Sequence, residues 1–200
     1  MKRIIVHMLL AIAVTAGAIV PASGQEPAIA KPDILTEETI LTTTRLNSYS
    51  TLIIRDFNTE GAEYSRVDEE ERAKIDAMKP ILARTITDNV EMQLKMKKLF
   101  STILINADAK ENAVILEGAF TEFNAGSRAL KFFVGFGAGK AYLKVKGRLI
   151  DAQTGQELAV FVDRETGYRG AIGLESYLDL FPHQAKSLGE NIAQFIEQLY

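Results

Sequence analysis

Polar and apolar residues alternate most regularly within residues 113–162 of the chain. Alternation with a period of two is typical of strands that bury one face, and it predicts strands over residues 113–123, 141–150 and 158–162. A turn sequence at residues 151–155 separates the last two runs. We therefore expect residues 141–162 to form an antiparallel hairpin.

The period becomes helical in residues 68–98. Apolar residues recur there every three or four positions and share one helix face, namely Ile75, Met78, Leu82, Ile86, Val90 and Leu94. Asp68 and Glu71 have the spacing of a capping box, which predicts where the helix starts. Pro80 has no N–H group and clashes one turn back, so we expect a kink or a restart near Lys79.

Shorter patterns predict the remaining elements. Apolar runs rich in β-branched residues predict strands over residues 51–57 and 100–105. Residues 164–181 are expected to form a loop with a short helical turn around Ser176. A final helix is expected to open at Pro182, with one apolar face formed by Ala185, Leu188, Ile192, Phe195 and Leu199.

The order of these elements predicts an α/β fold. We expect a two-layer sandwich in which a mixed, mostly antiparallel sheet of about five strands is covered by two long helices on one face. Residues 51–200 are predicted to form this single domain. Residues 25–50 carry two prolines, a run of threonines and little periodicity, so we interpret them as an extended lead-in rather than a packed element.

The first 24 residues have the features of a secretory signal peptide. Lys2 and Arg3 precede an apolar run over residues 4–20, and small residues follow it up to Gly24. We predict cleavage after Gly24 and export to the periplasm, or secretion if the cell has no outer membrane. An uncleaved anchor helix is the alternative interpretation of the apolar run.

Charge and cysteine content exclude several classes of partner and site. The chain has 26 acidic and 23 basic residues, and removal of residues 1–24 would make this balance more negative. A nucleic-acid partner is not expected, because phosphate recognition needs a basic face. The absence of cysteine excludes disulfides, thiol catalysis, zinc–thiolate sites and a lipid anchor on cysteine.

No catalytic constellation is evident in the sequence. His183 is the only histidine after residue 24, and a lone histidine near a helix start is more typical of a surface or capping residue. Glycines in residues 135–140 fit neither a Walker loop nor a dinucleotide fingerprint. We therefore expect no metal, no cofactor and no enzymatic activity, with catalysis by Asp163 and Glu165 as the enzymatic alternative.

Two sets of residues are candidates for binding. The first is an apolar, glycine-rich segment, which we interpret as an interaction surface with core packing as the alternative: Phe132, Phe133, Gly135, Phe136, Gly137 and Gly139. The second is the row of Lys144, Lys146 and Arg148 on one strand face. We interpret this row as solvated surface that protects against edge pairing, with an anion site as the alternative.

Residues 116–161 resemble a group of bacterial exported proteins that is classified only as a domain of unknown function and includes many lipoproteins. The glycine–phenylalanine run and residues 151–158 are more distantly similar to the curli-production assembly/transport (CsgG) family. The resemblance implies the same α/β fold and a role in the envelope. The chain departs from both groups because the lipidated cysteine is absent. It departs from the curli exporter because residues 124–140 lack the alternation of a pore-forming hairpin.

The sequence and the resemblance together predict a non-enzymatic periplasmic module of the cell envelope. We expect it to bind an envelope protein or a second copy of itself, and contact with a membrane surface without spanning it is left open. A ring-forming subunit of an export or envelope-assembly complex is the alternative function.

Overall fold

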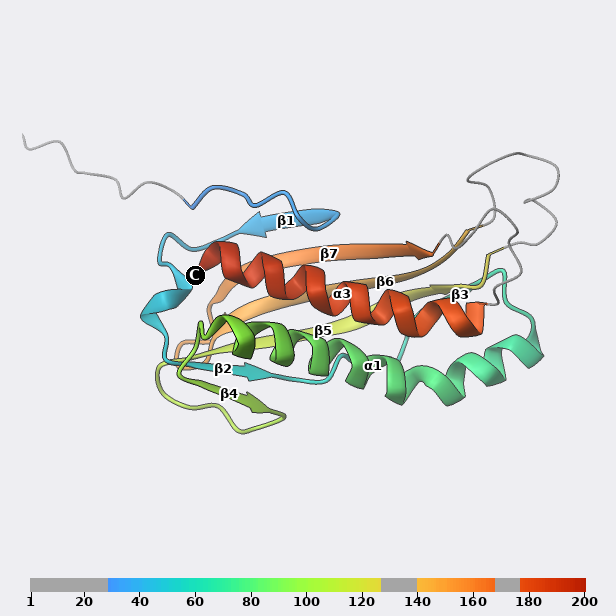
Figure 1. The fold of residues 1–200 in the computed structure, drawn as a ribbon, viewed down its shortest axis with the longest axis horizontal. Helices are drawn as coiled ribbons and strands as arrows, with labels where there is room; N and C mark the ends of the chain where they lie inside the picture. Colours follow the sequence, from blue (N-terminus) through green and yellow to red (C-terminus); the bar gives the residue numbers. More distant parts are fainter. Residues whose placement is uncertain (1–28, 127–139, 168–176) are drawn as a thin grey trace, which may run out of the picture.

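The computed structural model describes residues 29–126, 140–167 and 177–200. The predicted signal peptide, the candidate surface between residues 132 and 139, and the helical turn around Ser176 lie outside these residues. In chain order the elements are β1 (Glu37–Ile40), η1 (Leu46–Ser48), β2 (Thr51–Ile54), β3 (Glu63–Ser65), α1 (Glu69–Lys97), β4 (Thr102–Ile105), β5 (Ala113–Asn124), β6 (Ala141–Asp151), β7 (Glu157–Gly167) and α3 (Tyr177–Leu199) (Figure 1).

All described strands belong to one mixed sheet in the order β1-β7-β6-β5-β2-β4, with β3 paired to β5. The predicted hairpin is confirmed, since β6 pairs antiparallel with β7 and also with β5. Beyond β5 the pairing becomes parallel, because β2 lies between β5 and β4 and runs in the same direction as both. The sheet formed by the described residues has seven strands, so the expected number of about five was too low.

One of the additional strands, β1, lies in the segment that we interpreted as an unpacked lead-in, and this interpretation was wrong. Residues 37–40 pair antiparallel with β7. Glu38 is only 7% exposed, and its carboxylate accepts hydrogen bonds from the backbone N–H groups of Asp33, Ile34 and Leu35. Four residues are too few to show a period, which explains why sequence analysis missed the strand.

The helix α1 begins as predicted. Asp68 is its N-cap and forms both halves of the capping box with Glu71. Of the two outcomes expected near Lys79, the restart is wrong, because the helix continues through Pro80 to Lys97. The kink stays a prediction. Pro80 itself is exposed, and Leu82, Ile86 and Val90 after it are fully buried, so packing of this apolar face holds the helix together across the missing hydrogen bond.

The last strand and the last helix are both longer than predicted. β7 continues to Gly167, well beyond residue 162, and α3 begins at Tyr177 instead of opening at Pro182. Tyr177 and Phe181 are buried in the core. This aromatic packing keeps the residues before Pro182 helical, which local proline rules could not reveal.

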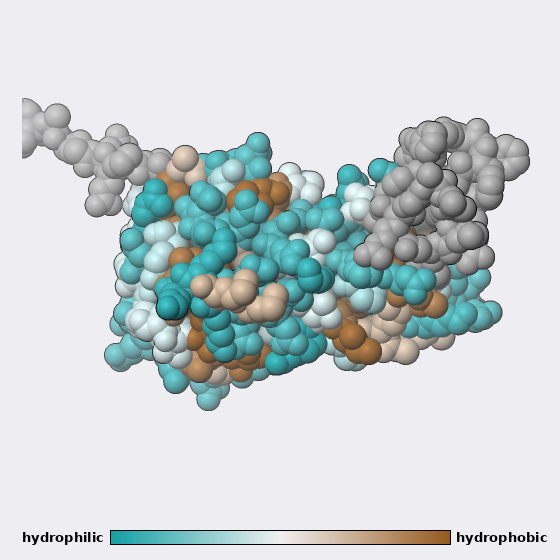
Figure 2. Space-filling view, viewed as in Figure 1, coloured by the Kyte–Doolittle hydropathy of each residue, from teal (hydrophilic) through white to brown (hydrophobic). Residues whose placement is uncertain are grey.

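The two helices lie side by side on one face of the sheet, as the fold prediction required (Figure 1). Fully buried side chains of the sheet and of α3 fill the space between the layers, among them Leu52, Ile54, Leu116, Leu188 and Ile192. On the helix-bearing side, apolar surface is divided into separate patches (Figure 2). Within the described part of the chain, no helix combines the length and hydropathy that a membrane span requires.

Candidate functional site on the uncovered sheet face

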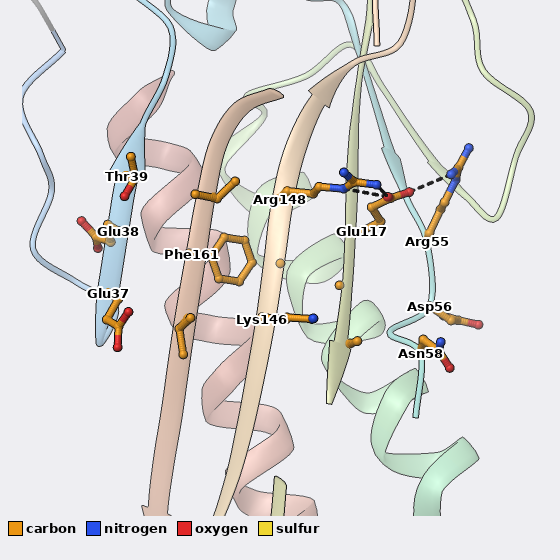
Figure 3. Close-up of a pocket in the computed structure, with 15 residues that line it drawn as sticks. Glu37, Glu38, Thr39, Arg55, Asp56, Asn58, Glu117, Lys146, Arg148 and Phe161 are labelled. Atoms are coloured by element: carbon orange, nitrogen blue, oxygen red, sulfur yellow. Dashed lines mark hydrogen bonds and ion pairs between the residues drawn. The ribbon is translucent and has the colours of Figure 1, made fainter. Parts of the chain in front are cut away.

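The sheet face opposite the helices carries a groove of about 710 Å³. Its lining comes from β1, β5, β6, β7 and the residues that follow β2 (Figure 3). The groove thus crosses the strands and does not follow any one of them. Its shape depends on two neighbouring rows of side chains that run across the sheet.

The first row, which we name the ion-pair row, consists of Thr39, Val160, Arg148, Glu117 and Arg55. Glu117 is its centre. The Glu117 carboxylate accepts hydrogen bonds from Nε (2.9 Å) and Nη2 (2.6 Å) of Arg148 and from Nη1 of Arg55 (2.7 Å) (Figure 3). Arg148 also contacts Glu157 at 2.8 Å. Both arginines are therefore committed to carboxylates within the protein.

These contacts determine the ionisation of Glu117. Burial by itself would raise its pKa, but the hydrogen bonds and charges of Arg148 and Arg55 outweigh burial and hold the pKa below its ordinary value. The Glu117 side chain remains 23% exposed, so it stands at the wall of the groove as an anion already paired with cations. This arrangement gives a rigid charged wall and no acid that could release a proton at neutral pH.

The second row, which we name the open row, consists of Glu37, Val162, Lys146, Ala119 and Asn58. Small and apolar side chains flank Lys146 on both neighbouring strands. Lys146 is exposed, and no acidic group among the residues that the structure describes lies within ion-pair distance of its ammonium. Glu37 is exposed at the β1 end of the row, and no basic group among the described residues lies within ion-pair distance of its carboxylate.

The wall that follows β2 is held by hydrogen bonds. The Asp56 carboxylate accepts from Thr87 Oγ1 (2.7 Å) and from Asn106 Nδ2 (2.9 Å). Asn58 bonds through its backbone to Gly118 and Phe120 of β5. Because these groups are oriented by internal contacts, this wall of the groove is formed before any ligand arrives.

The cation row predicted from the sequence lies partly in this groove. Lys146 and Arg148 line it, on the uncovered face as expected. Protection against edge pairing is nevertheless wrong as a role, since β6 is an interior strand between β5 and β7. Lys144 faces Glu122 and Arg164 on its neighbouring strands and lies outside the groove. The alternative interpretation of this row as an anion site therefore concerns Lys146, because Arg148 is paired with carboxylates and Lys144 lies outside the groove.

The two carboxylates of the enzymatic alternative come together on the other face, below α3. Asn191 Nδ2 donates to Asp163 Oδ2 (3.2 Å) and to Glu165 Oε1 (2.7 Å). Asp163 is 3% exposed and accepts from the N–H and the hydroxyl of Thr36, which anchors the residues before β1. Burial outweighs the hydrogen bond from Asn191 and raises the pKa of Glu165. These contacts join α3, β7 and the amino-terminal segment.

Residues 29–126, 140–167 and 177–200 contain no set of metal ligands. No group of three or more His, Asp or Glu side chains gathers there with the geometry of a metal site. His183 is the seventh residue of α3, and its side chain interacts with another group of the protein. The absence of metal, cofactor and enzymatic activity stays a prediction from the sequence.

A family model for a domain of unknown function, DUF4410, matches residues 52–171. The chain belongs to the DUF4410 family. The match spans β2 to β7, so the ion-pair row from Arg55 to Val160 and Lys146 of the open row lie within the DUF4410 region, whereas Glu37 and Thr39 of β1 lie before it. The predicted resemblance to a domain of unknown function is confirmed, and the more distant similarity to the curli assembly family stays a prediction.

Comparison with solved structures finds distant likenesses. A PelC dodecamer from Paraburkholderia phytofirmans is 10% identical (TM-score 0.43), with 78% of this chain and 95% of that chain covered. A minor lipoprotein from Acinetobacter baumannii is 12% identical (TM-score 0.35), with 74% and 92% covered. No curated protein matches the chain. The DUF4410 match is therefore the comparison on which the family assignment rests.

Proposed function

We propose that this DUF4410 protein is a non-enzymatic module of the bacterial cell envelope, and that it binds a protein partner through the groove on the uncovered sheet face. The observation that carries the proposal is the contrast between the two rows of the groove. The ion-pair row is rigid and internally compensated, whereas Lys146 and Glu37 of the open row have no ionic partner among the described residues. A preformed wall beside uncompensated charges is the arrangement of a recognition surface.

The chemistry of the groove supports binding over catalysis. Glu117 is held as an anion by two arginines, and Asp56 accepts two side-chain hydrogen bonds. A general acid or base needs a pKa near neutrality and a free path to the substrate proton. Glu117, whose pKa is held below its ordinary value by the two arginines, does not have these properties, and Asp56 is engaged in two side-chain hydrogen bonds. The polar groups of this groove are therefore suited to orient a partner.

The envelope location rests on the amino-terminal sequence. Residues 1–24 have the charged start, apolar run and small-residue end of a signal peptide. The resemblance of residues 116–161 to exported bacterial proteins supports the same location.

Site-specific photo-crosslinking in cells tests the proposal. A photoreactive residue at Val162, on the floor of the groove, is expected to crosslink to one envelope protein. The same residue at Met96, which is 65% exposed on α1, is the matched control and is expected to give no such product. Equal products from both positions, or a product from Met96 alone, would contradict the proposed surface.

The ring-forming alternative gives a different result in the same experiment. The product at Val162 would then contain two copies of this chain, and light scattering of the purified protein would give one discrete assembly of many subunits. A monomer or dimer in solution, with a different protein crosslinked at Val162, supports the partner-binding module.

A further inference from the structure

We infer that the groove accepts an extended peptide segment of the partner and that an acidic side chain of this segment pairs with Lys146. The inference rests on the proposed function and names the chemistry of the partner. It is drawn from the charges, the dimensions and the floor of the groove.

The charges of the groove determine which residue of the partner is recognised. Lys146 and Arg148 lie two residues apart on the same face of β6, yet only Arg148 is paired, with Glu117 and Glu157. In the open row, Ala119 occupies the position next to Lys146 that corresponds to Glu117 in the ion-pair row. Lys146 therefore faces a small apolar neighbour where Arg148 faces a carboxylate, and an acid from outside can take this place.

The other end of the open row limits where this acid can lie. Glu37 pairs in register with Val162, and Val162 pairs with Lys146, so Glu37 stands two strands away from Lys146 on the same face. A second acidic residue at the β1 end would meet the charge of Glu37 and be repelled. The bound segment is therefore expected to carry its acid in the middle or towards β5.

The dimensions of the groove favour an extended chain. The open row crosses β1, β7, β6 and β5 and ends at Asn58. Four interstrand spacings of about 4.8 Å span about 19 Å. An extended chain covers this length with about six residues at about 3.3 Å each. The groove volume of about 710 Å³ is of the size that such a segment or a small ligand fills.

The floor of the groove determines the character of the flanking residues. Val160, Val162 and Ala119 present aliphatic surface on both sides of Lys146. Apolar residues beside the acid would cover this surface and exclude water from the ion pair, which strengthens it. The expected segment is therefore an acidic residue between apolar residues.

Selection from a random hexapeptide display library, with the purified protein as bait, tests the inference. Selected peptides are expected to be enriched in Asp or Glu at one position with apolar neighbours. Lys146→Gln should abolish this enrichment, and Lys146→Glu should select Lys or Arg at the same position. Lys144→Gln, on the same strand and face but outside the groove, is the matched control and should keep the acidic preference.

Several outcomes would overturn the inference. They are the absence of any enriched peptide, enrichment without a charge preference, a preference that survives in Lys146→Gln, and an equal loss in Lys144→Gln. Lys146 is exposed and unpaired among the described residues, so its variants are expected to fold, and thermal melting by circular dichroism checks this.

The failure of this inference is distinguishable from failure of the proposed function. If Val162 crosslinks to an envelope protein and Lys146→Glu leaves the crosslink unchanged, the partner-binding function stands and the acidic segment is wrong. If the peptide selection follows the charge of residue 146 but no envelope protein crosslinks at Val162, the recognition chemistry stands and the proposed function is wrong.

Discussion

Gly118 of β5 lies directly opposite Gly147 of β6, and aromatic rings from the adjoining chain segments occupy the space that their side chains would fill. A Cβ atom at Gly118 would overlap the ring of Phe57, and one at Gly147 would overlap the ring of Phe161. Both rings are almost fully buried between the sheet and the helices. The two rings therefore fill the space beside the glycines at the centre of the sheet. They lie on the helix-covered face, directly behind the groove.

This packing predicts the effect of adding one methyl group. Gly147→Ala forces Phe161 out of its position against Phe195 and should lower the free energy of unfolding by about 1–3 kcal/mol. Urea unfolding followed by circular dichroism measures the change. In the double variant Gly147→Ala/Phe161→Leu the smaller side chain relieves the overlap, so the two losses should be less than additive. Strict additivity would contradict this account.

The Glu117 contacts predict a pH-dependent contribution to stability. Since the folded protein holds the pKa of Glu117 below its unfolded value, its ionic contribution is complete above about pH 4.5 and is lost as the pH falls through the folded pKa. Glu117→Gln should lower the stability at pH 7 by less than about 1 kcal/mol, because both arginines are about half exposed. The difference in urea midpoint between the variant and the parent should shrink below pH 4.

The same experiment has a salt control. The contribution of the ion-pair row should decrease in high salt, because the pairs are solvent-accessible. A difference between Glu117→Gln and the parent that is insensitive to both pH and salt would indicate that Glu117 acts through packing alone.

The raised pKa of Glu165 predicts a pH dependence of stability opposite in sign to that of Glu117. Its pKa is raised in the folded protein, so folding favours the protonated form, and stability is lost as the pH rises from about 4.5 through the folded pKa. Glu165→Gln removes the charge and keeps an oxygen that can accept from Asn191. The variant should melt at a higher temperature than the parent at pH 7, and this gain should vanish near pH 4.

A surface carboxylate on the other helix provides the control for Glu165. Glu91 pairs with Lys95 on α1, so Glu91→Gln should leave the melting temperature at pH 7 unchanged or slightly lower. An equal gain from both substitutions would show that the effect arises from net charge and not from the site of Asn191.

The raised pKa of Tyr49 predicts an effect on the ultraviolet titration of the tyrosines at alkaline pH. Burial, together with the hydrogen bond to Asp151 and the negative charge of that residue, raises the pKa of Tyr49 to about 12. Tyr49→Phe should remove one tyrosine that ionises near pH 12 from the ultraviolet titration. It should also lower the free energy of unfolding by about 0.5–1.5 kcal/mol, the value of one hydrogen bond. A titration identical to that of the parent would refute the assignment.

Local patterns in the sequence predicted those parts of the fold whose cause is local. Alternation in residues 141–162 and the turn at residues 151–155 predicted the β6–β7 hairpin, because strand faces and turn geometry depend on neighbouring residues. The capping box of Asp68 and Glu71 predicted the start of α1 for the same reason. The faces of Lys146 and Arg148 followed from their spacing alone.

Only the tertiary structure determined which side chains lie next to Lys146 and Arg148 on the sheet face. Insertion of β2 between β5 and β4 brings Arg55 to Glu117, and addition of β1 to β7 brings Glu37 to the row of Lys146. These residues are far apart in the chain. Which distant strands pair depends on how the whole sheet buries its side chains, and a short sequence pattern does not contain this information. The composition of the strand determined that β6 carries three cations, but strand order determined that Arg148 is paired and Lys146 is not.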